Sequence, residues 1–415
     1  MIEVAAAIAL ASSRFALKSG DRVVFYGDSI TQEQNADLVY PDFIEAYVVT
    51  RYPGIDARFF NLGWPGDSTW GGEGGSSEQR VKRDVAPVRP TLVTIMLGMN
   101  DAGYVPFDQK IEDIYREWYG KLLGWMHEAA PHARFDLIQT SPYDSITHDP
   151  ARSDDFTAQM IRLPYNSVLL RFGEVVKEIA KKNGYGFVDF NQPVLDLLTA
   201  AKATDPETAR MIVPDGIHPA SAGHAVMAAH LLTAWGADPL VSDIEIDLGA
   251  GKIGRSENAS VEAVSKSGWT SLEASLPYPL QLGDAAQRMV ATKTETLDLV
   301  GREMLAVNGL ASGRYRLTID DKKVADLDAA ELAKGINLNA YETPMMDQAV
   351  RVLDLVKKRN HLFFVRRHDL QWSLGGIADV TQASRDLDAL AKQVRKAEIA
   401  AAKPVSHRFT LTPIA

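Results

Sequence analysis

The chain has 415 residues, of which 46% are hydrophobic and 24% are charged, and its formal net charge is −10. This length predicts about two domains, and the acidic balance argues against general nucleic-acid binding, which needs a basic surface. Because the chain has no cysteine, disulfides, Cys-based zinc sites and a cysteine nucleophile are excluded.

The first 20 residues are expected to form a separate N-terminal segment. Residues 4–12 (VAAAIALAS) are short, apolar and rich in alanine, as in the apolar part of a secretory signal. No lysine or arginine precedes them and Glu3 has the wrong sign, so an ordinary first helix explains them equally well. We expect a secreted or periplasmic protein rather than a cytoplasmic one. No stretch approaches the roughly 20 apolar residues of an integral membrane segment.

Residues 21–236 alternate between short apolar runs and helical patterns. The runs predict strands at 22–26, 57–62, 91–97, 135–140 and 186–190. The run at 91–97 (TLVTIML) is typical of a strand that is buried on both faces. Apolar residues recur every three or four positions at 111–130 and 166–182, which predicts helices. Residues 222–235 predict a third helix, which is rich in apolar residues. This alternation indicates a mainly parallel sheet covered by helices, and such sheets bind ligands beyond the carboxyl ends of their strands.

The pattern changes after about residue 236. Residues 241–248 (VSDIEIDL) alternate between polar and apolar, which predicts a half-buried antiparallel strand. Further strands are predicted at 261–264, 269–276, 313–319 and 408–411, and helices at 345–359 and 383–402. We therefore predict that residues 237–415 form an appended β-rich module with helices.

Two short motifs follow the first two predicted strands. Gly27-Asp28-Ser29 places a serine on a tight strand-to-helix turn, where the helix N-terminus favours developing negative charge. An ordinary turn with Ser29 as a helix cap explains the tripeptide as well. Residues 61–68 (NLGWPGDS) include Gly66, whose backbone N–H could approach a substrate oxyanion, although many turns simply need glycine.

Two more motifs occur further along the first domain. Asn100 follows the apolar run at 91–97 in the sequence Gly98-Met99-Asn100-Asp101, and its amide can donate to an oxyanion. Asn-Asp pairs are also common in turns. Asp215 precedes His218 by three residues, so its carboxylate can fold back onto the imidazole Nδ1–H and leave Nε2 free to take a proton from Ser29. Taken together, the four motifs supply a nucleophile, a base, an orienting carboxylate and oxyanion donors, which are the roles of acyl transfer.

These motifs resemble the SGNH/GDSL hydrolase superfamily, whose named Ser, Gly, Asn and His match Ser29, Gly66, Asn100 and His218. The resemblance covers about residues 20–236. It implies a flavodoxin-like three-layer α/β/α domain and ester hydrolysis through an acyl-enzyme, without a metal or another cofactor. By the same resemblance, Ser29, Asp215 and His218 are the catalytic triad, and the oxyanion hole consists of the N–H groups of Ser29 and Gly66 with the Asn100 amide.

Other residues on the neighbouring loops are candidates for substrate binding: Asp28, Trp64, Trp70, Tyr104 and Tyr143. Aromatic faces suit a sugar ring or an apolar acyl group, and local packing is the alternative. The glycine-rich stretch at 71–77 predicts a mobile loop at the rim of the site. The histidines show no convincing metal spacing, and His224 is expected to be structural, so we predict no metal site.

The expected activity is that of a serine esterase that hydrolyses short-chain esters, acetyl esters above all, on a small ester or an acetylated saccharide. The step from fold to substrate is an analogy. A lipolytic esterase or lysophospholipase is the second hypothesis. A third, from another class, makes the chain a glycan-binding or cell-envelope protein through residues 237–415. No feature of the sequence indicates an oligomeric state.

Overall fold

The computed structural model describes residues 15–32, 38–145 and 165–414, and the apolar stretch at 4–12 lies outside the described residues. The chain divides into two compact units. Residues 17–44 and 55–234 make up one, here called the parallel-sheet unit. Residues 1–16, 45–54 and 235–415 make up the other, the β-rich unit. Among the described residues, no helix is long and apolar enough to cross a membrane.

The parallel-sheet unit is built on a five-stranded sheet in the order β2-β1-β5-β6-β7, in which every neighbouring pair is parallel. The strands are β1 (Arg22–Gly27), β2 (Arg58–Asn61), β5 (Leu92–Met96), β6 (Arg134–Gln139) and β7 (Gly186–Asp189). Each lies where an apolar run predicted it, and the strand order is that of flavodoxin-like folds. The predicted α/β class is therefore confirmed.

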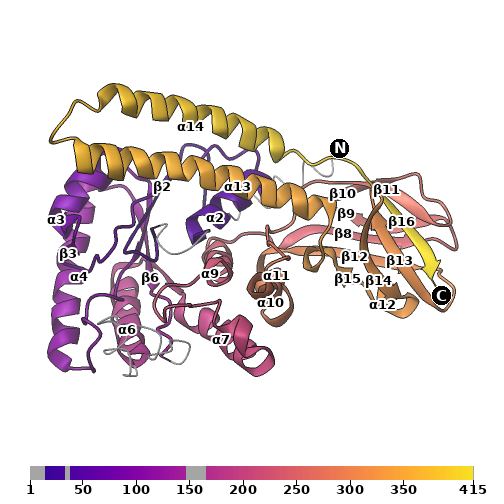
Figure 1. The fold of residues 1–415 in the computed structure, drawn as a ribbon, viewed down its shortest axis with the longest axis horizontal. Helices are drawn as coiled ribbons and strands as arrows, with labels where there is room; N and C mark the ends of the chain where they lie inside the picture. The colour runs from indigo at the N-terminus through magenta and orange to yellow at the C-terminus, as the bar shows by residue number, and fades with distance from the viewer. Residues whose placement is uncertain (1–14, 33–37, 146–164, 415) are drawn as a thin grey trace. The chain divides into compact units, whose positions relative to one another are not determined.

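Helices cover both faces of this sheet (Figure 1). The three predicted helices are α4 (Gln109–Ala129), α6 (Asn166–Asn183) and α9 (Ser221–Ala234). Three others had no counterpart in the prediction: α3 (Ser77–Arg80), α7 (Asn191–Thr204) and α8 (Pro206–Ala209). The same is true of α2 (Tyr40–Arg51), which begins in this unit and belongs to the β-rich unit from Glu45 onward. Between α3 and β5 the chain forms a π-helical turn (Val81–Val85) and a 3₁₀ turn (Ala86–Val88).

The glycine-rich stretch at 71–77 differs from its prediction. Instead of a loop it forms a small hairpin from β3 (Gly71–Gly72) and β4 (Gly75–Ser76). The Ser76 side chain accepts from the Gln79 N–H and the Gln79 side chain accepts from the Ser76 N–H, so a capping box starts α3 directly after the hairpin.

The sheet has its topological switch point between β1 and β5. The chain leaves β1 toward β2 on one side and returns to β5 on the other. Loops at the carboxyl ends of two such strands diverge and leave a crevice where ligands bind. The sequence motifs that contain Ser29 and Asn100 follow these two strands.

The β-rich unit contains two larger sheets. An antiparallel sheet has the order β10-β11-β16-β13-β14, with β10 (Ala259–Glu262), β11 (Gly268–Glu273), β16 (His407–Ile414), β13 (Arg314–Ile319) and β14 (Lys322–Asp328). A mixed sheet has the order β15-β12-β8-β9, with β15 (Ile336–Asn337), β12 (Arg302–Asn308), β8 (Leu240–Asp247) and β9 (Lys252–Glu257). The prediction that β8 is an antiparallel strand is half wrong, because it pairs antiparallel with β9 but parallel with β12.

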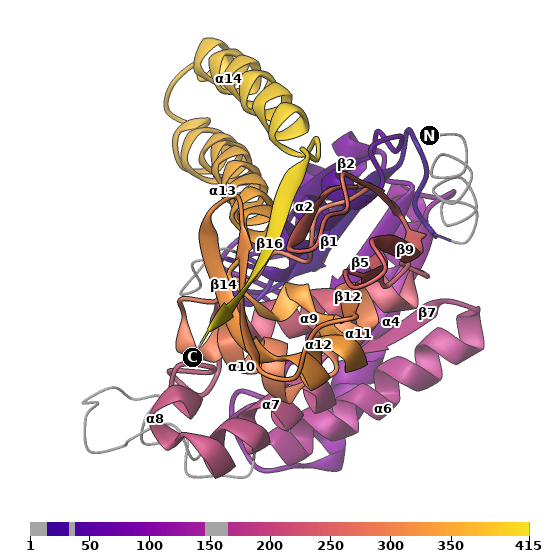
Figure 2. The ribbon, with the colours of Figure 1, turned by 90° about the vertical axis from the view of Figure 1, so that its right-hand side faces the viewer.

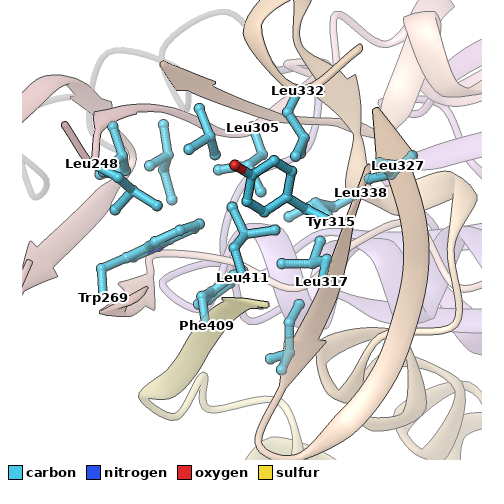
Figure 3. Close-up of a cluster of buried hydrophobic side chains, with 14 of the residues drawn as sticks. Leu248, Trp269, Leu305, Tyr315, Leu317, Leu327, Leu332, Leu338, Phe409 and Leu411 are labelled. Atoms are coloured by element: carbon cyan, nitrogen blue, oxygen red, sulfur yellow. The ribbon is translucent and has the colours of Figure 1, made fainter. Parts of the chain in front are cut away.

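A continuous apolar core packs the β-rich unit (Figure 3). Trp269 of β11 stacks on Phe409 of β16 with ring centroids 5.0 Å apart. Leu317 from β13 and Leu305 from β12 are fully buried in the same cluster. Alternate residues of these strands point into it, as period-two burial requires.

Helices complete the β-rich unit. The short ones are α10 (Ala285–Lys293), α11 (Thr296–Val300) and α12 (Ala329–Lys334). Two long helices, α13 (Pro344–Phe364) and α14 (Thr381–Ala401), run side by side as a hairpin (Figures 1 and 2). Arg359 of α13 binds Glu45 and, at 2.6 Å, Glu398 of α14.

Candidate active site

Ser29 lies on the turn that leaves the carboxyl end of β1. A Cβ on Gly27 would come within 2.8 Å of the Met96 carbonyl oxygen on the neighbouring strand, so only glycine fits where the turn begins. The Asp28 carboxylate accepts the N–H of Ile30 at 2.9 Å and holds the turn closed around Ser29.

A hydrogen-bonded chain connects Ser29 to His218 and Asp215. The Ser29 Oγ lies 2.8 Å from His218 Nε2, and His218 Nδ1 lies 2.6 Å from Asp215 Oδ2. These three residues come from two loops that are 189 positions apart in the sequence. The structure therefore brings together all three residues of the predicted triad, in an arrangement that lets Nε2 take the serine proton.

The loop around Asp215 is organised by the carboxylate itself. Its Oδ1 accepts the backbone N–H groups of Ile217, at 2.9 Å, and His218, at 2.7 Å. Burial opposes ionisation of this carboxyl, but the hydrogen bonds and the charge interaction with His218 outweigh it, and the pKa of Asp215 lies below its usual value. Asp215 is therefore an anion when it faces the imidazole.

Gly66 occupies a tight turn after β2. The Asp67 N–H donates to the Trp64 carbonyl at 3.3 Å, and Gly66 has φ +69°, a conformation that favours glycine. Within the described part of the chain, neither the Gly66 N–H nor the Ser29 N–H has a hydrogen-bond partner. The N–H of the alternative glycine, Gly63, is bound to Asn61 Oδ1 at 3.0 Å. These contacts favour Gly66 over Gly63 as an oxyanion donor.

Asn100 lies after β5, beside the Gly66 turn. Its Nδ2 donates to the Asp67 carbonyl at 2.9 Å, and its Oδ1 accepts the Tyr104 hydroxyl at 3.0 Å. An amide nitrogen carries two hydrogens, so one N–H remains after the bond to Asp67. The structure thus places Asn100 next to the turn with which it is predicted to share the oxyanion.

Two buried anchors fix these loops, and sequence reasoning missed both. The Asp101 carboxylate accepts the N–H of Thr69 at 2.8 Å and its hydroxyl at 2.6 Å, which ties the β5 loop to the chain after Gly66. Burial raises the pKa of Asp101 to about 7. Arg80 is fully buried and binds Asp67, Asp84 (Nε to Oδ2, 3.0 Å) and the Leu62 carbonyl. The position of Asp101 directly after Asn100 was a usable signal, whereas Arg80 had none.

Three of the five predicted substrate-binding residues have little exposed surface, and their contacts lie within the fold. Asp28 is fully buried, its carboxylate holds the Ser29 turn, and burial raises its pKa to about 7. Trp64 is only 2% exposed and packs against the guanidinium groups of Arg80 and Arg83. Tyr143 is also buried, with its ring edge-on to Tyr165.

The other two predicted residues keep accessible surface. Trp70 is 37% exposed, and Tyr104 is half-buried beside Asn100. They remain candidates for substrate contact.

His224 has the structural place expected of it. It is buried in α9, its ring stacks on Tyr40, and its Nδ1 accepts the Tyr40 N–H at 3.2 Å. Burial first, and then the charge of His218, lower the pKa of His224 to about 3. The neutral imidazole therefore links α9, the helix that follows His218, to Tyr40 at the start of α2.

Comparisons with known proteins relate the chain to one enzyme family and to two solved structures. The model of the GDSL-like lipase/acylhydrolase family matches residues 25–226. Among solved structures, the chain is similar to BT4096, a gut microbial diltiazem-metabolizing enzyme, with 27% identity over 97% of this chain and 100% of that chain and a TM-score of 0.74. It is also similar to Axe2, an acetylxylan esterase from Geobacillus stearothermophilus, with 23% identity over 54% of this chain and 97% of that chain and a TM-score of 0.42. No curated protein sequence matches the chain.

Proposed function

The chain belongs, through residues 25–226, to the GDSL-like lipase/acylhydrolase family, and from this membership we propose a serine esterase that removes short acyl groups, chiefly acetyl, from a carbohydrate or another small alcohol. One observation carries the proposal. The Ser29 Oγ, the His218 imidazole and the Asp215 carboxylate form an unbroken hydrogen-bonded chain with distances of 2.8 and 2.6 Å.

In the proposed reaction, His218 Nε2 takes the Ser29 proton while Oγ attacks the ester carbonyl carbon. The imidazolium then gives this proton to the departing alcohol oxygen as the C–O bond breaks, which leaves an acyl group on Ser29. A water molecule, deprotonated by the same nitrogen, attacks the acyl-enzyme and releases the acid. Asp215 keeps the imidazole in the tautomer that accepts at Nε2 and stabilises its charged form.

The oxyanion of each tetrahedral intermediate needs donors that are already in place. The N–H groups of Ser29 and Gly66 lack partners within the described residues, and Asn100 keeps one N–H after its bond to the Asp67 carbonyl. We assign the oxyanion hole to these three donors.

Two observations support the proposed acyl and alcohol preferences. Trp70 and Tyr104 offer aromatic surface on the loops after β2 and β5, and such surface suits a sugar ring. BT4096, which is similar over almost the whole chain, is a diltiazem-metabolizing enzyme, and diltiazem carries one acetate ester. Both points favour a short acyl group on a cyclic alcohol part.

Acetate release distinguishes the candidate substrates. Wild type and Ser29→Ala would be compared on acetylated xylooligosaccharides, on diltiazem and on p-nitrophenyl esters from acetate to laurate. We expect hydrolysis of the acetyl substrates that falls by a factor on the order of 10⁴ or more in Ser29→Ala. A preference for long acyl chains would favour the lipolytic hypothesis. Activity that survives in Ser29→Ala would contradict the proposed nucleophile.

A further inference from the structure

Both ends of the Asn100 amide are bound in a way that allows one orientation. A backbone carbonyl can only accept, so the end of the amide that lies 2.9 Å from the Asp67 oxygen must be the NH₂ group. The carbonyl end then faces Tyr104, whose hydroxyl donates to Asn100 Oδ1 at 3.0 Å. Rotation of the amide by half a turn would set two oxygens against each other at Asp67.

Tyr104 reaches Asn100 only through an unusual backbone conformation. Its φ of +59° lies in the left-handed region, directly after Gly103 at φ +58°. A residue with a Cβ pays a conformational cost there that the surrounding structure must offset. The Tyr104 ring packs against Tyr165, with centroids 5.0 Å apart, and the Tyr165 hydroxyl donates to the Met99 carbonyl at 2.8 Å. The packing therefore fixes both the ring and the chain just before Asn100.

We propose that Tyr104 is a positioning residue that holds the Asn100 amide ready to stabilise the oxyanion, an inference that rests on the proposed ester hydrolysis. The hydroxyl fixes the side-chain rotamer, so no reorganisation is needed when negative charge develops. A hydrogen bond accepted at Oδ1 also polarises the amide and strengthens its N–H groups as donors. Tyr104 was predicted from the sequence to bind substrate, and the two roles differ in their kinetic effects.

The experiment is a double-mutant cycle on the full chain with p-nitrophenyl acetate. It compares wild type, Tyr104→Phe, Asn100→Ala and the double variant. Tyr104→Phe removes one neutral hydrogen bond and is expected to lower kcat roughly 5- to 30-fold with KM nearly unchanged. In the Asn100→Ala background the same change should alter kcat by less than about twofold, because there is no amide left to position.

Tyr119→Phe is the matched control. It removes a buried tyrosine hydroxyl of the same unit, one without a hydrogen-bond partner in the described residues, and it should leave kcat and KM near the wild-type values. Equal effects of Tyr104→Phe in both backgrounds would overturn the proposal. So would a raised KM at constant kcat, which would instead assign Tyr104 to substrate contact.

A crystal structure of Tyr104→Phe tests the inference without turnover. We expect Asn100 to populate a second rotamer or an altered amide position in this variant, and a single unchanged rotamer would overturn the positioning role. If the wild type hydrolyses no ester in a Ser29-dependent manner, the proposed function fails, and the crystal structure still decides whether Tyr104 positions the amide.

Discussion

Two buried clusters, one in each unit, compensate their ionisable side chains in opposite ways. In the parallel-sheet unit, Arg80 lies between Asp67 and Asp84 and donates to both carboxylates. In the β-rich unit, Glu303 adjoins a second buried carboxyl, Glu273, which accepts the Ser242 hydroxyl at 3.0 Å. The first arrangement balances charge with charge, whereas the second favours a carboxyl that keeps its proton.

This difference shows that a buried carboxyl does not by itself mark a site. Asp67 carries the carbonyl that binds Asn100, so its ion pair holds a loop of the candidate active site. Glu303 holds no such loop. The carboxylate proposed to act in catalysis, Asp215, is the least buried of these groups, with a side chain 41% exposed. Substitutions of Asp215, Arg80 and Glu303 should therefore affect, respectively, the activity, the stability and the pH dependence of the stability.

The largest effect is expected at Asp215. Asp215→Asn should lower kcat by a factor on the order of 10³–10⁴, because a neutral amide does not stabilise the imidazolium and can select the wrong tautomer. Since the side chain is partly exposed, Tm should stay within about 2 °C of the wild type. Ester hydrolysis and calorimetry on the same preparation measure both. The control is Glu207→Gln, an exposed carboxyl on α8, and a kcat for Asp215→Asn within about tenfold of the wild type would remove Asp215 from the triad.

The next largest effect is expected for the buried ion pairs that Arg80 forms with Asp67 and Asp84. Arg80→Met should lower the free energy of unfolding by about 3–5 kcal/mol, because it leaves Asp67 and Asp84 buried without their shared cation. Arg83 binds the same Asp84 at 2.7 Å, but its side chain is 33% exposed. Arg83→Met should therefore cost only about 1 kcal/mol or less. Urea denaturation of the two variants gives the comparison, and equal losses would show that burial does not govern the contribution of these ion pairs.

Contacts that are local in sequence could be predicted. The Asp215 and His218 side chains lie three residues apart on one turn, and the apolar runs of the five parallel strands are visible in the sequence alone. The role of Trp64 could not be predicted, because its packing partner Arg80 is 16 positions away and reaches it only in the folded chain.

The secondary-structure elements that were missed have a related cause. α2 is buried along its whole length, so its sequence lacks the polar face that reveals an amphipathic helix. β9 is exposed at all six positions, so no apolar alternation marks it. Its pairing with β8 is the feature that makes it a strand. Each element is determined by its neighbours in the fold rather than by its own pattern.

The smallest effect is expected at Glu303 and depends on pH. Burial first, and then the adjoining Glu273 carboxylate, raise the pKa of Glu303 well above its usual value. From about pH 4.5 up to that raised pKa, the native state binds a proton that the unfolded chain has lost, so the free energy of unfolding falls as pH rises. A glutamine side chain does not titrate, so the Glu303→Gln variant lacks this contribution to the pH dependence of the free energy of unfolding.

The Tm of Glu303→Gln relative to the wild type should therefore increase between pH 5 and pH 8, while kcat stays the same. The control is Glu262→Gln, an exposed carboxyl on β10, for which the difference in Tm should not change with pH. Buried carboxyls remote from Glu303, such as Asp28 and Asp101, act equally on wild type and variant, so they cancel in the difference. A Glu303→Gln difference that stays flat or decreases with pH would mean that Glu303 is ionised in the native state. Both clusters would then contain ionised carboxylates, and the contrast between them would disappear.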